Sequence, residues 1–253
     1  MLNNLANDSN AGAPSSNRVS GEPQASGSRK LRVIERGASL FQEDASQPEI
    51  VRIVDGCLCV FSWLSNERRQ IIDILGPGRL VDEHLFNQKR CNVIALTRTR
   101  LRSVDLVDEE PSTVKALQQM WWRAQSHVTL LGRKTMTEKV AVALLDLAGQ
   151  FGLPSKKRSG GDITFQLHLT RADLADWLGL TLSTVSRCLN AFKHHGLITF
   201  DDPKLITIRN RDTLEALASG ICVSAYRSPH RSGRIRRSHT SDPVIPTASS
   251  QEN

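Results

Sequence analysis

Between residues 169 and 208, apolar positions recur with the period of two short helices and then of two strands. In the first helix, Thr170 is the expected N-cap and Asp173 its capping-box partner. The apolar face of this helix comprises Leu174, Trp177 and Leu178. Gly179 ends it, because glycine adopts the left-handed conformation that a tight turn requires at low cost.

The second helix begins after Thr181, which is its expected cap, and stops at Gly196. Its apolar residues recur at spacings of four and three and face inward together: Val185, Leu189 and Phe192. The start and the outer face comprise Leu182, Ser183, Thr184, Ser186 and Arg187. Residues 198–200 and 205–208 then alternate like two strands around a polar turn. This order is the plan of a winged helix-turn-helix, whose second helix enters the DNA major groove.

The preceding half of the chain has a different pattern. Short apolar runs separated by turn signals predict five strands, at 50–54, 57–64, 69–75, 93–96 and 101–106. The Asp55-Gly56 pair indicates a hairpin turn, and Gly76-Pro77-Gly78 closes the third run. Many short strands at regular spacing are typical of an all-β sandwich or barrel. One further strand is expected at 163–167, within the C-terminal part.

A helix is expected over residues 108–135, and a second one over 138–151. Apolar residues at alternating spacings of three and four form a seam along the first helix: Val114, Leu117, Trp121, Ala124, Val128 and Leu131. Such a seam is typical of a two-stranded coiled coil and therefore predicts a homodimer. The alternative is a helix that packs on its own domain. Trp122 lies beside the seam, where it is expected to pack on the β-rich part.

Composition refines this picture. The chain of 253 residues allows one or two domains, and its net charge of +7 fits a partner that carries phosphates. Five cysteines, an odd number, indicate a reducing cytoplasm, and no apolar run has the length of a membrane span. Residues 1–28 and the basic stretch 221–253 lack apolar periodicity and are expected to be disordered tails. No Ser/His/Asp set, paired-carboxylate motif or P-loop indicates an enzyme.

Residues 169–181, followed by Thr184-Val185-Ser186-Arg187, resemble the DNA-binding domain of the CRP/FNR family, most closely its FNR and FixK branches. The stretches 40–41, 53–56 and 75–78 resemble the family's β-roll. The resemblance implies an α+β fold with a cyclic-nucleotide-binding-like roll (29–107), a long dimerisation helix (108–135) and a C-terminal winged helix-turn-helix (136–220). It implies a cytoplasmic transcription regulator that binds a palindromic promoter site as a homodimer, contacts RNA polymerase and activates transcription.

The same resemblance assigns roles on the DNA. Arg187 matches the base-reading arginine of the motif Glu-x-x-Ser-Arg and Ser186 its serine, while Ser183 replaces its glutamate. An arginine bound to a guanine discriminates that base by ~1–3 kcal/mol. The candidates for phosphate contacts are Thr170, Arg171, Thr181, Thr184, Lys193 and Lys204. The threonines have helix capping alone as an alternative role.

We expect neither a cofactor nor a metal. Val81 and Asp82 stand where nucleotide-binding relatives carry Phe-Gly, and a carboxylate there repels a phosphate. No cysteine precedes Cys57, so the N-terminal iron–sulfur ligands of FNR have no counterpart. Cys57 and Cys59 are expected to fill the roll interior, or alternatively to be oxidised or bind a metal. The rival hypothesis is a regulator whose roll binds a nucleotide, haem or metal that controls DNA binding.

Cys188 is a candidate redox residue, because it directly follows Arg187 in the second helix. An oxidised sulfur there would displace the arginine and weaken DNA binding. The alternative is packing, since Cys188 lies three residues after Val185, at the edge of the inward face.

Overall fold

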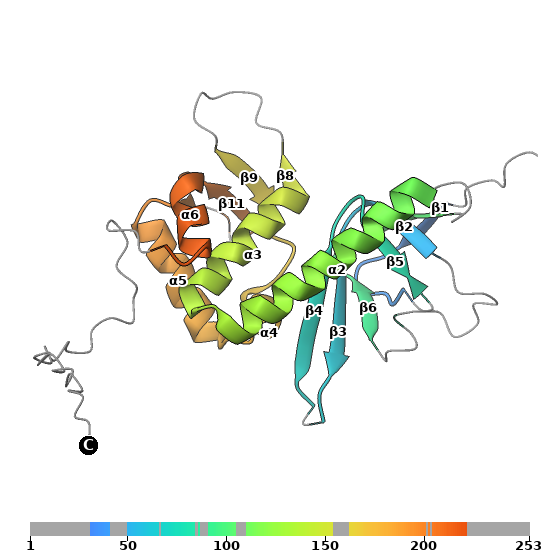
Figure 1. Cartoon of the computed structure of the whole chain (residues 1–253), viewed down its shortest axis with the longest axis horizontal. Helices are drawn as coiled ribbons and strands as arrows, with labels where there is room; N and C mark the ends of the chain where they lie inside the picture. Colours follow the sequence, from blue (N-terminus) through green and yellow to red (C-terminus); the bar gives the residue numbers. More distant parts are fainter. Residues whose placement is uncertain are drawn as a thin grey trace, which may run out of the picture.

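The computed structural model describes residues 31–40, 50–65, 67–83, 86, 91–104, 110–153, 162–200, 202 and 204–221. The two expected tails lie outside the described residues, except for Ile221. The described part forms a β-roll, a long helix and a C-terminal domain (Figure 1). In this part of the chain, no helix is long and apolar enough to cross a membrane.

The roll is built from two antiparallel sheets. One has the order β1-β7-β2-β5 and contains β1 (Leu31–Ile34), β7 (Thr99–Ser103), β2 (Ile50–Asp55) and β5 (Leu80–Asp82). The other has the order β4-β3-β6 and contains β4 (Arg69–Leu75), β3 (Leu58–Trp63) and β6 (Asn92–Ala95). All five expected strands are confirmed, although residues 105 and 106 of the last one lie outside the described residues. The two that the sequence pattern missed, β1 and β5, have only four and three residues.

Strand β3 is covered on both of its faces. Leu58 and Val60 point into the roll with Val51, Ile53 and Leu101. Cys57, Cys59 and Phe61 belong instead to the apolar cluster that continues into the C-terminal domain. The expectation that the two cysteines fill the roll interior is therefore wrong. Period-two alternation does not reveal which face is which when both faces are apolar. Both thiols are fully buried, and burial raises the pKa of each.

Helix α2 (Glu110–Arg133) runs obliquely from the roll to the C-terminal domain (Figure 1). Helix α3 (Met136–Phe151) follows and is capped by Thr135 with Glu138 in a capping box. Arg123 of α2 pairs with Asp73 of β4 and, at 2.5 Å, with Asp146 of α3. This ion-pair network joins the roll, the long helix and the C-terminal domain.

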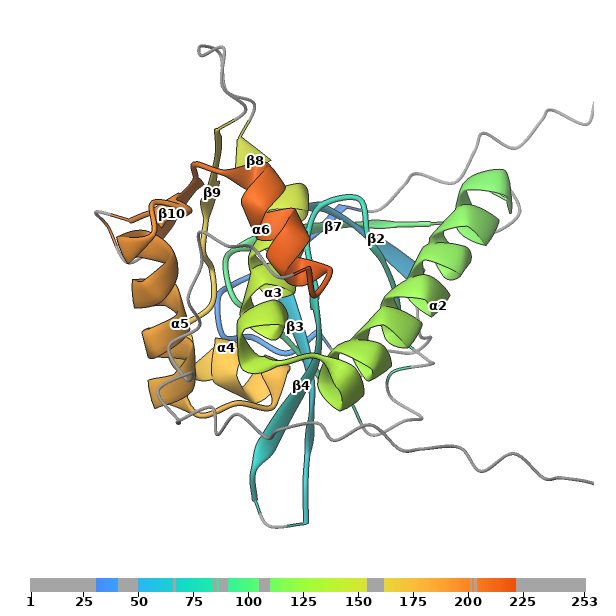
Figure 2. The ribbon, with the colours of Figure 1, turned by 60° about the vertical axis from the view of Figure 1, so that its left-hand side comes forward.

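The C-terminal domain is a helical core beside a small sheet (Figure 2). Its helices are α3, α4 (Arg171–Leu178), α5 (Leu182–His194) and α6 (Arg211–Ala218). Its sheet has the antiparallel order β10-β11-β9-β8, with β10 (Ile198–Thr199), β11 (Leu205–Ile208), β9 (Ile163–Gln166) and β8 (Gly152–Leu153). The expected strands and helices are confirmed to within a residue or two, whereas α6 and β8 were not expected.

The roll contacts the C-terminal domain directly through β4 and α4. The guanidinium of Arg69 binds Asp173 at 2.5 Å and Asp176 at 2.9 Å. Gln70 donates from its side-chain amide to the carbonyl oxygen of Asp176 at 2.8 Å. The first helix of the helix-turn-helix is thus held against the roll by side chains that stand next to one another on one strand.

Candidate DNA-binding site and dimer interface

Local hydrogen bonds fix where α4 begins and ends. The Thr170 hydroxyl accepts from the Asp173 N–H at 3.1 Å, and the Asp173 carboxylate accepts from the Thr170 N–H at 2.8 Å. Gly179 ends the helix in the left-handed region at φ 60°. Burial raises the pKa of Asp173, but the hydrogen bonds from Thr170 and Arg69 outweigh it and hold that pKa below its ordinary value. The predicted capping box and glycine turn are confirmed.

Helix α5 presents one buried and one exposed side. The hydroxyl of Thr181 caps the helix by accepting from the Thr184 N–H at 3.2 Å. The inward residues are Val185, Cys188, Leu189 and Phe192. Ser183 and Arg187 are exposed and Ser186 is half-buried. The expectation that Thr184 lies on the outer face is wrong, because it is only 7% exposed. Its hydroxyl bonds that of Thr181 at 2.8 Å, which favours capping over a phosphate contact.

Arg187 is free to meet a base. Its side chain is exposed, and its one hydrogen bond given by the structure runs from Nε to the Ser183 carbonyl oxygen at 3.3 Å. No carboxylate of the described residues forms an ion pair with it. In Figure 2, α5 lies at the outer edge of the C-terminal domain, on the side away from α2. An unpaired guanidinium on such a helix suits the bidentate recognition of a guanine.

Two of the expected phosphate-binding cations gather on one aromatic ring. The guanidinium carbon of Arg171 lies 5.7 Å from the centre of the Phe200 ring, and Nζ of Lys193 lies 4.6 Å from it. Arg171 also reaches the Ser186 hydroxyl at 3.5 Å, at the limit of a hydrogen bond. The ring orders two flexible side chains beside α5. The sequence pattern placed Phe200 in a strand and gave no signal of this role.

The strands β10 and β11 form the wing beside α5. Lys204, at its tip, is exposed, and its N–H donates to the Asp202 carboxylate at 2.7 Å. Arg209, a wing residue that the sequence analysis did not single out, pairs with Asp162 at 2.6 Å. Among the described residues, Lys204 at the wing has no ion-pair partner, whereas the charge of Arg209 is balanced by Asp162.

Cys188 faces inward and is 1% exposed. Burial raises the pKa of its thiol, although a hydrogen bond with Thr137 and the charge of Arg187 oppose that effect. A buried thiol with a raised pKa reacts slowly with oxidants. The redox role of Cys188 stays a prediction, and the structure favours the packing alternative.

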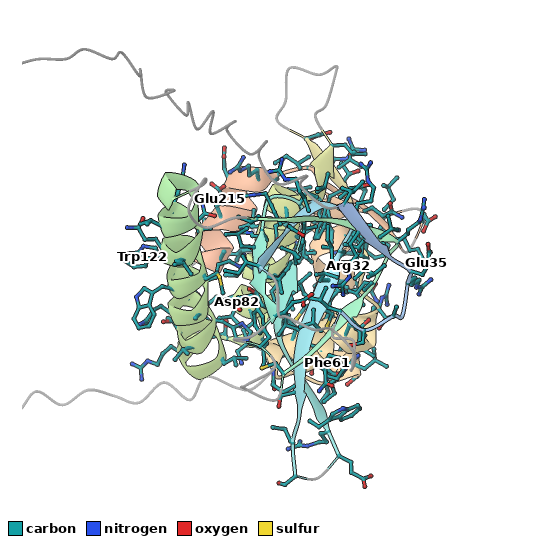
Figure 3. The ribbon with its side chains drawn as sticks, turned by 90° about the vertical axis from the view of Figure 1, so that its right-hand side faces the viewer. Arg32, Glu35, Phe61, Asp82, Trp122 and Glu215 are labelled. Atoms are coloured by element: carbon teal, nitrogen blue, oxygen red, sulfur yellow. The ribbon has the colours of Figure 1, made fainter. Side chains whose placement is uncertain are left out.

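The seam on α2 is largely uncovered. Val114, Leu117, Trp121 and Val128 are each more than half exposed. Only Leu131, at the end of the helix, packs partly against the C-terminal domain. Trp122 is 69% exposed, so the expectation that it packs on the roll is wrong. Figure 3 shows it on the outer side of α2. Four large apolar side chains in one exposed row are typical of a helix that packs against another chain.

An antiparallel roll, a long helix with an exposed apolar row and a winged helix-turn-helix define a two-domain DNA-binding regulator. Comparison with known proteins agrees. The model of the Crp-like helix-turn-helix domain matches residues 138–217, and that of the cyclic nucleotide-binding domain matches residues 31–108. The roll and the DNA-binding domain thus each have their own family match.

Relatives that are named as transcription or nitrogen-fixation regulators match most of the chain. The nitrogen fixation regulation protein FixK of Azorhizobium caulinodans is 32% identical over 197 residues, covering 74% of this chain and 78% of that protein. The transcriptional activator protein FnrL of Cereibacter sphaeroides is 28% identical, covering 70% and 75%. The structure of FixK2 from Bradyrhizobium japonicum superposes with a TM-score of 0.59 at 28% identity, covering 75% and 97%. The chain belongs to the CRP/FNR family of transcription regulators, close to FixK and FNR.

Proposed function

We propose that this protein is a non-enzymatic, cytoplasmic regulator that binds a palindromic promoter site as a homodimer and activates transcription with RNA polymerase. The observation that carries the proposal is Arg187, which is exposed on the second helix of a helix-turn-helix and pairs with no carboxylate of the described residues. Ser183 and Ser186, on the same helix, are the nearest candidates to share base contacts with it.

Exposure ranks the candidates for contacts with the DNA phosphates. Arg171 stands at the start of α4, Lys193 in the last turn of α5, and Lys204 at the wing. Such cations orient the domain on the duplex without reading its sequence. Thr170 and Thr181 cap α4 and α5 and are exposed. Each therefore places polar groups on the protein surface that is proposed to face the DNA phosphates. Thr184 is the weakest member of the proposed set because it is buried.

The dimer is supported by the uncovered seam of α2. Burial of an exposed Leu or Val side chain stabilises a dimer by roughly 1.5–3 kcal/mol. In a two-fold symmetric dimer each such residue is buried twice, once from each chain. A symmetric dimer of helix-turn-helix proteins places its recognition helices about one turn of DNA apart, which predicts a palindrome with that spacing. Activation is inferred from the relative named as a transcriptional activator.

A pair of matched variants tests the reading role of Arg187. Arg187→Ala removes a proposed base contact, and Lys193→Ala removes a proposed phosphate contact from the same helix. Affinities are measured for a selected operator and for scrambled DNA of the same length. We expect Arg187→Ala to lose ~1–3 kcal/mol per half-site on the operator and little on scrambled DNA. Lys193→Ala should weaken both about equally.

Equal losses of Arg187→Ala on the two DNAs would show that Arg187 contacts phosphate only. The thermal midpoint is the control for folding, because Arg187 is exposed and Arg187→Ala should leave that midpoint unchanged.

A further inference from the structure

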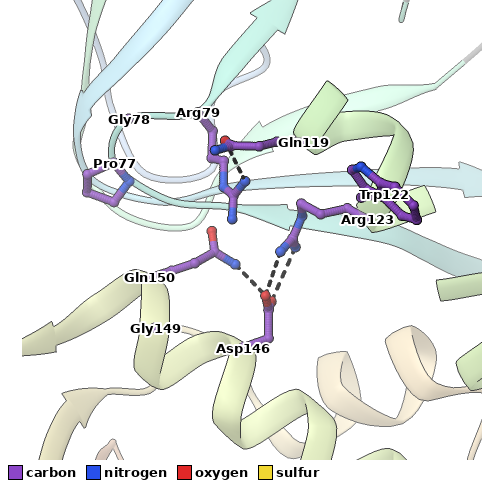
Figure 4. Close-up of a pocket in the computed structure, with 9 residues that line it drawn as sticks. All are labelled: Pro77, Gly78, Arg79, Gln119, Trp122, Arg123, Asp146, Gly149 and Gln150. Carbon is purple, nitrogen blue, oxygen red and sulfur yellow. Dashed lines mark hydrogen bonds and ion pairs between the residues drawn. The ribbon is translucent and has the colours of Figure 1, made fainter. Parts of the chain in front are cut away.

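A cavity of about 540 Å³ opens where the roll, α2 and α3 meet (Figure 4). Arg79 enters it from the turn between β4 and β5, Gln119, Trp122 and Arg123 from α2, and Asp146 and Gln150 from α3. Its lining comes from the turn between β4 and β5 and from two helices, and includes no residue of the apolar cluster inside the roll. The cavity has the size of sites that hold small organic molecules.

Most polar groups around this cavity are already engaged. Arg123 binds the carboxylates of Asp73 and Asp146. The Gln150 amide donates to the Asp146 carboxylate at 2.9 Å and to the Ile74 carbonyl oxygen at 3.2 Å. These groups hold one another in place and leave little capacity for a ligand. Asp146, the acidic residue of the wall, is neutralised by Arg123.

Arg79 is different. It is half-buried, and its one hydrogen bond that the structure gives goes to the Gln119 side-chain oxygen at 3.4 Å. No carboxylate of the described residues lies within ion-pair distance of it. Burial and the charge of Arg123 lower the pKa of Arg79, and the charges of Asp146 and Asp73 only partly oppose this. The cavity therefore contains a guanidinium whose charge is not paired by any carboxylate in the part of the chain that the structure describes.

Trp122 is the second unexplained feature. Its indole is 69% exposed yet lines the cavity. At about 100° per residue, Gln119 and Trp122 lie roughly 130° or more around α2 from the middle of the seam. The proposed dimer contact therefore leaves this aromatic face uncovered.

We propose that this cavity binds a small planar organic anion, an aromatic carboxylate by class. The carboxylate receives two parallel hydrogen bonds from Arg79 and one from the Gln119 amide, and the aromatic ring stacks on Trp122. Such a ligand would contact the roll and α2 together. The inference goes beyond the proposed function, and binding at this site requires neither DNA nor a ligand inside the roll.

The test is calorimetric titration of the full chain with benzoate and with benzamide, its neutral isostere. We expect one saturable benzoate site per chain and binding of benzamide at least tenfold weaker, since benzamide keeps the shape and loses the charge. Arg79→Gln should weaken benzoate at least tenfold. The matched control, Arg98→Gln, removes an exposed arginine that pairs with Glu35 on the roll and should change affinity less than twofold.

Trp122→Leu separates stacking from charge. It should weaken benzoate severalfold while leaving the thermal midpoint unchanged, because Trp122 is exposed. The proposal is overturned if benzoate shows no saturable binding up to about 10 mM, a concentration that detects millimolar dissociation constants. It is also overturned if benzamide binds equally well, or if the two arginine variants lose affinity alike. Should Arg79→Gln fail to fold, the benzoate and benzamide comparison on the native chain still decides the outcome.

Discussion

Val128→Glu is the sharpest perturbation of the proposed dimer. Val128 is 70% exposed, so the substitution removes no contact within one chain. Burial of a valine side chain against a partner contributes roughly 1.5–3 kcal/mol, and a symmetric dimer loses two copies, or about 3–6 kcal/mol. That loss raises the dissociation constant of the dimer by roughly 10²–10⁴-fold. Repulsion between the two new carboxylates adds to it.

Thr129→Glu is the matched control. It adds the same charge one residue further along α2, on an exposed position about 100° away around the helix. Sedimentation velocity over a concentration series gives the dissociation constant of each dimer. We expect native-like dimers for Thr129→Glu and monomers for Val128→Glu at micromolar concentration, with sharply lower operator affinity. Leu117→Glu should behave like Val128→Glu.

A Val128→Glu chain that dimerises as tightly as the native chain would refute this reasoning. The interface would then lie elsewhere, and the exposed row on α2 would need another partner.

Three further predictions concern side chains of α2 and of the C-terminal domain. Thr181→Ala removes the acceptor of the Thr184 N–H and should cost about 1 kcal/mol in chemical denaturation. Burial lowers the pKa of His127 in the folded chain, so the neutral imidazole stabilises the fold above about pH 6.5 and this contribution is lost as pH falls. The thermal midpoint of the native chain should therefore drop below that pH, and that of His127→Gln should drop less. After mild peroxide, native chain and Cys188→Ala should retain equal operator binding, and a reversible loss in the native chain alone would establish a redox switch.

The sequence specified the helix-turn-helix well because its signals are local. A capping box at Thr170 and Asp173 and a left-handed glycine at Gly179 involve residues at most a few positions apart. Periodicity then placed α5 and its inward face correctly, apart from Thr184. Thr184 faces inward, where its hydroxyl bonds that of the cap residue Thr181. A helical wheel does not resolve such a residue at the border between the two faces.

The errors share a different cause, which is packing between distant segments. Cys59 alternates with Val60 in a run that is apolar on both faces, so only the position of the C-terminal domain shows which face is the roll interior. Phe200 acquires its role from Arg171 and Lys193, which come from two other elements. Helix α6, with eight residues, is too short to form alone and depends on docking against α3.

Selection of bound sequences from a random DNA pool tests the central claim most directly. For the native chain we predict an enriched palindrome whose half-sites are centred about 10–10.5 base pairs apart, or a multiple of that spacing. The Arg187→Ala chain should lose its preference at one base pair in each half-site, symmetrically. Enrichment of a single unrepeated half-site, or no enrichment at all, would contradict a homodimer that reads DNA through α5.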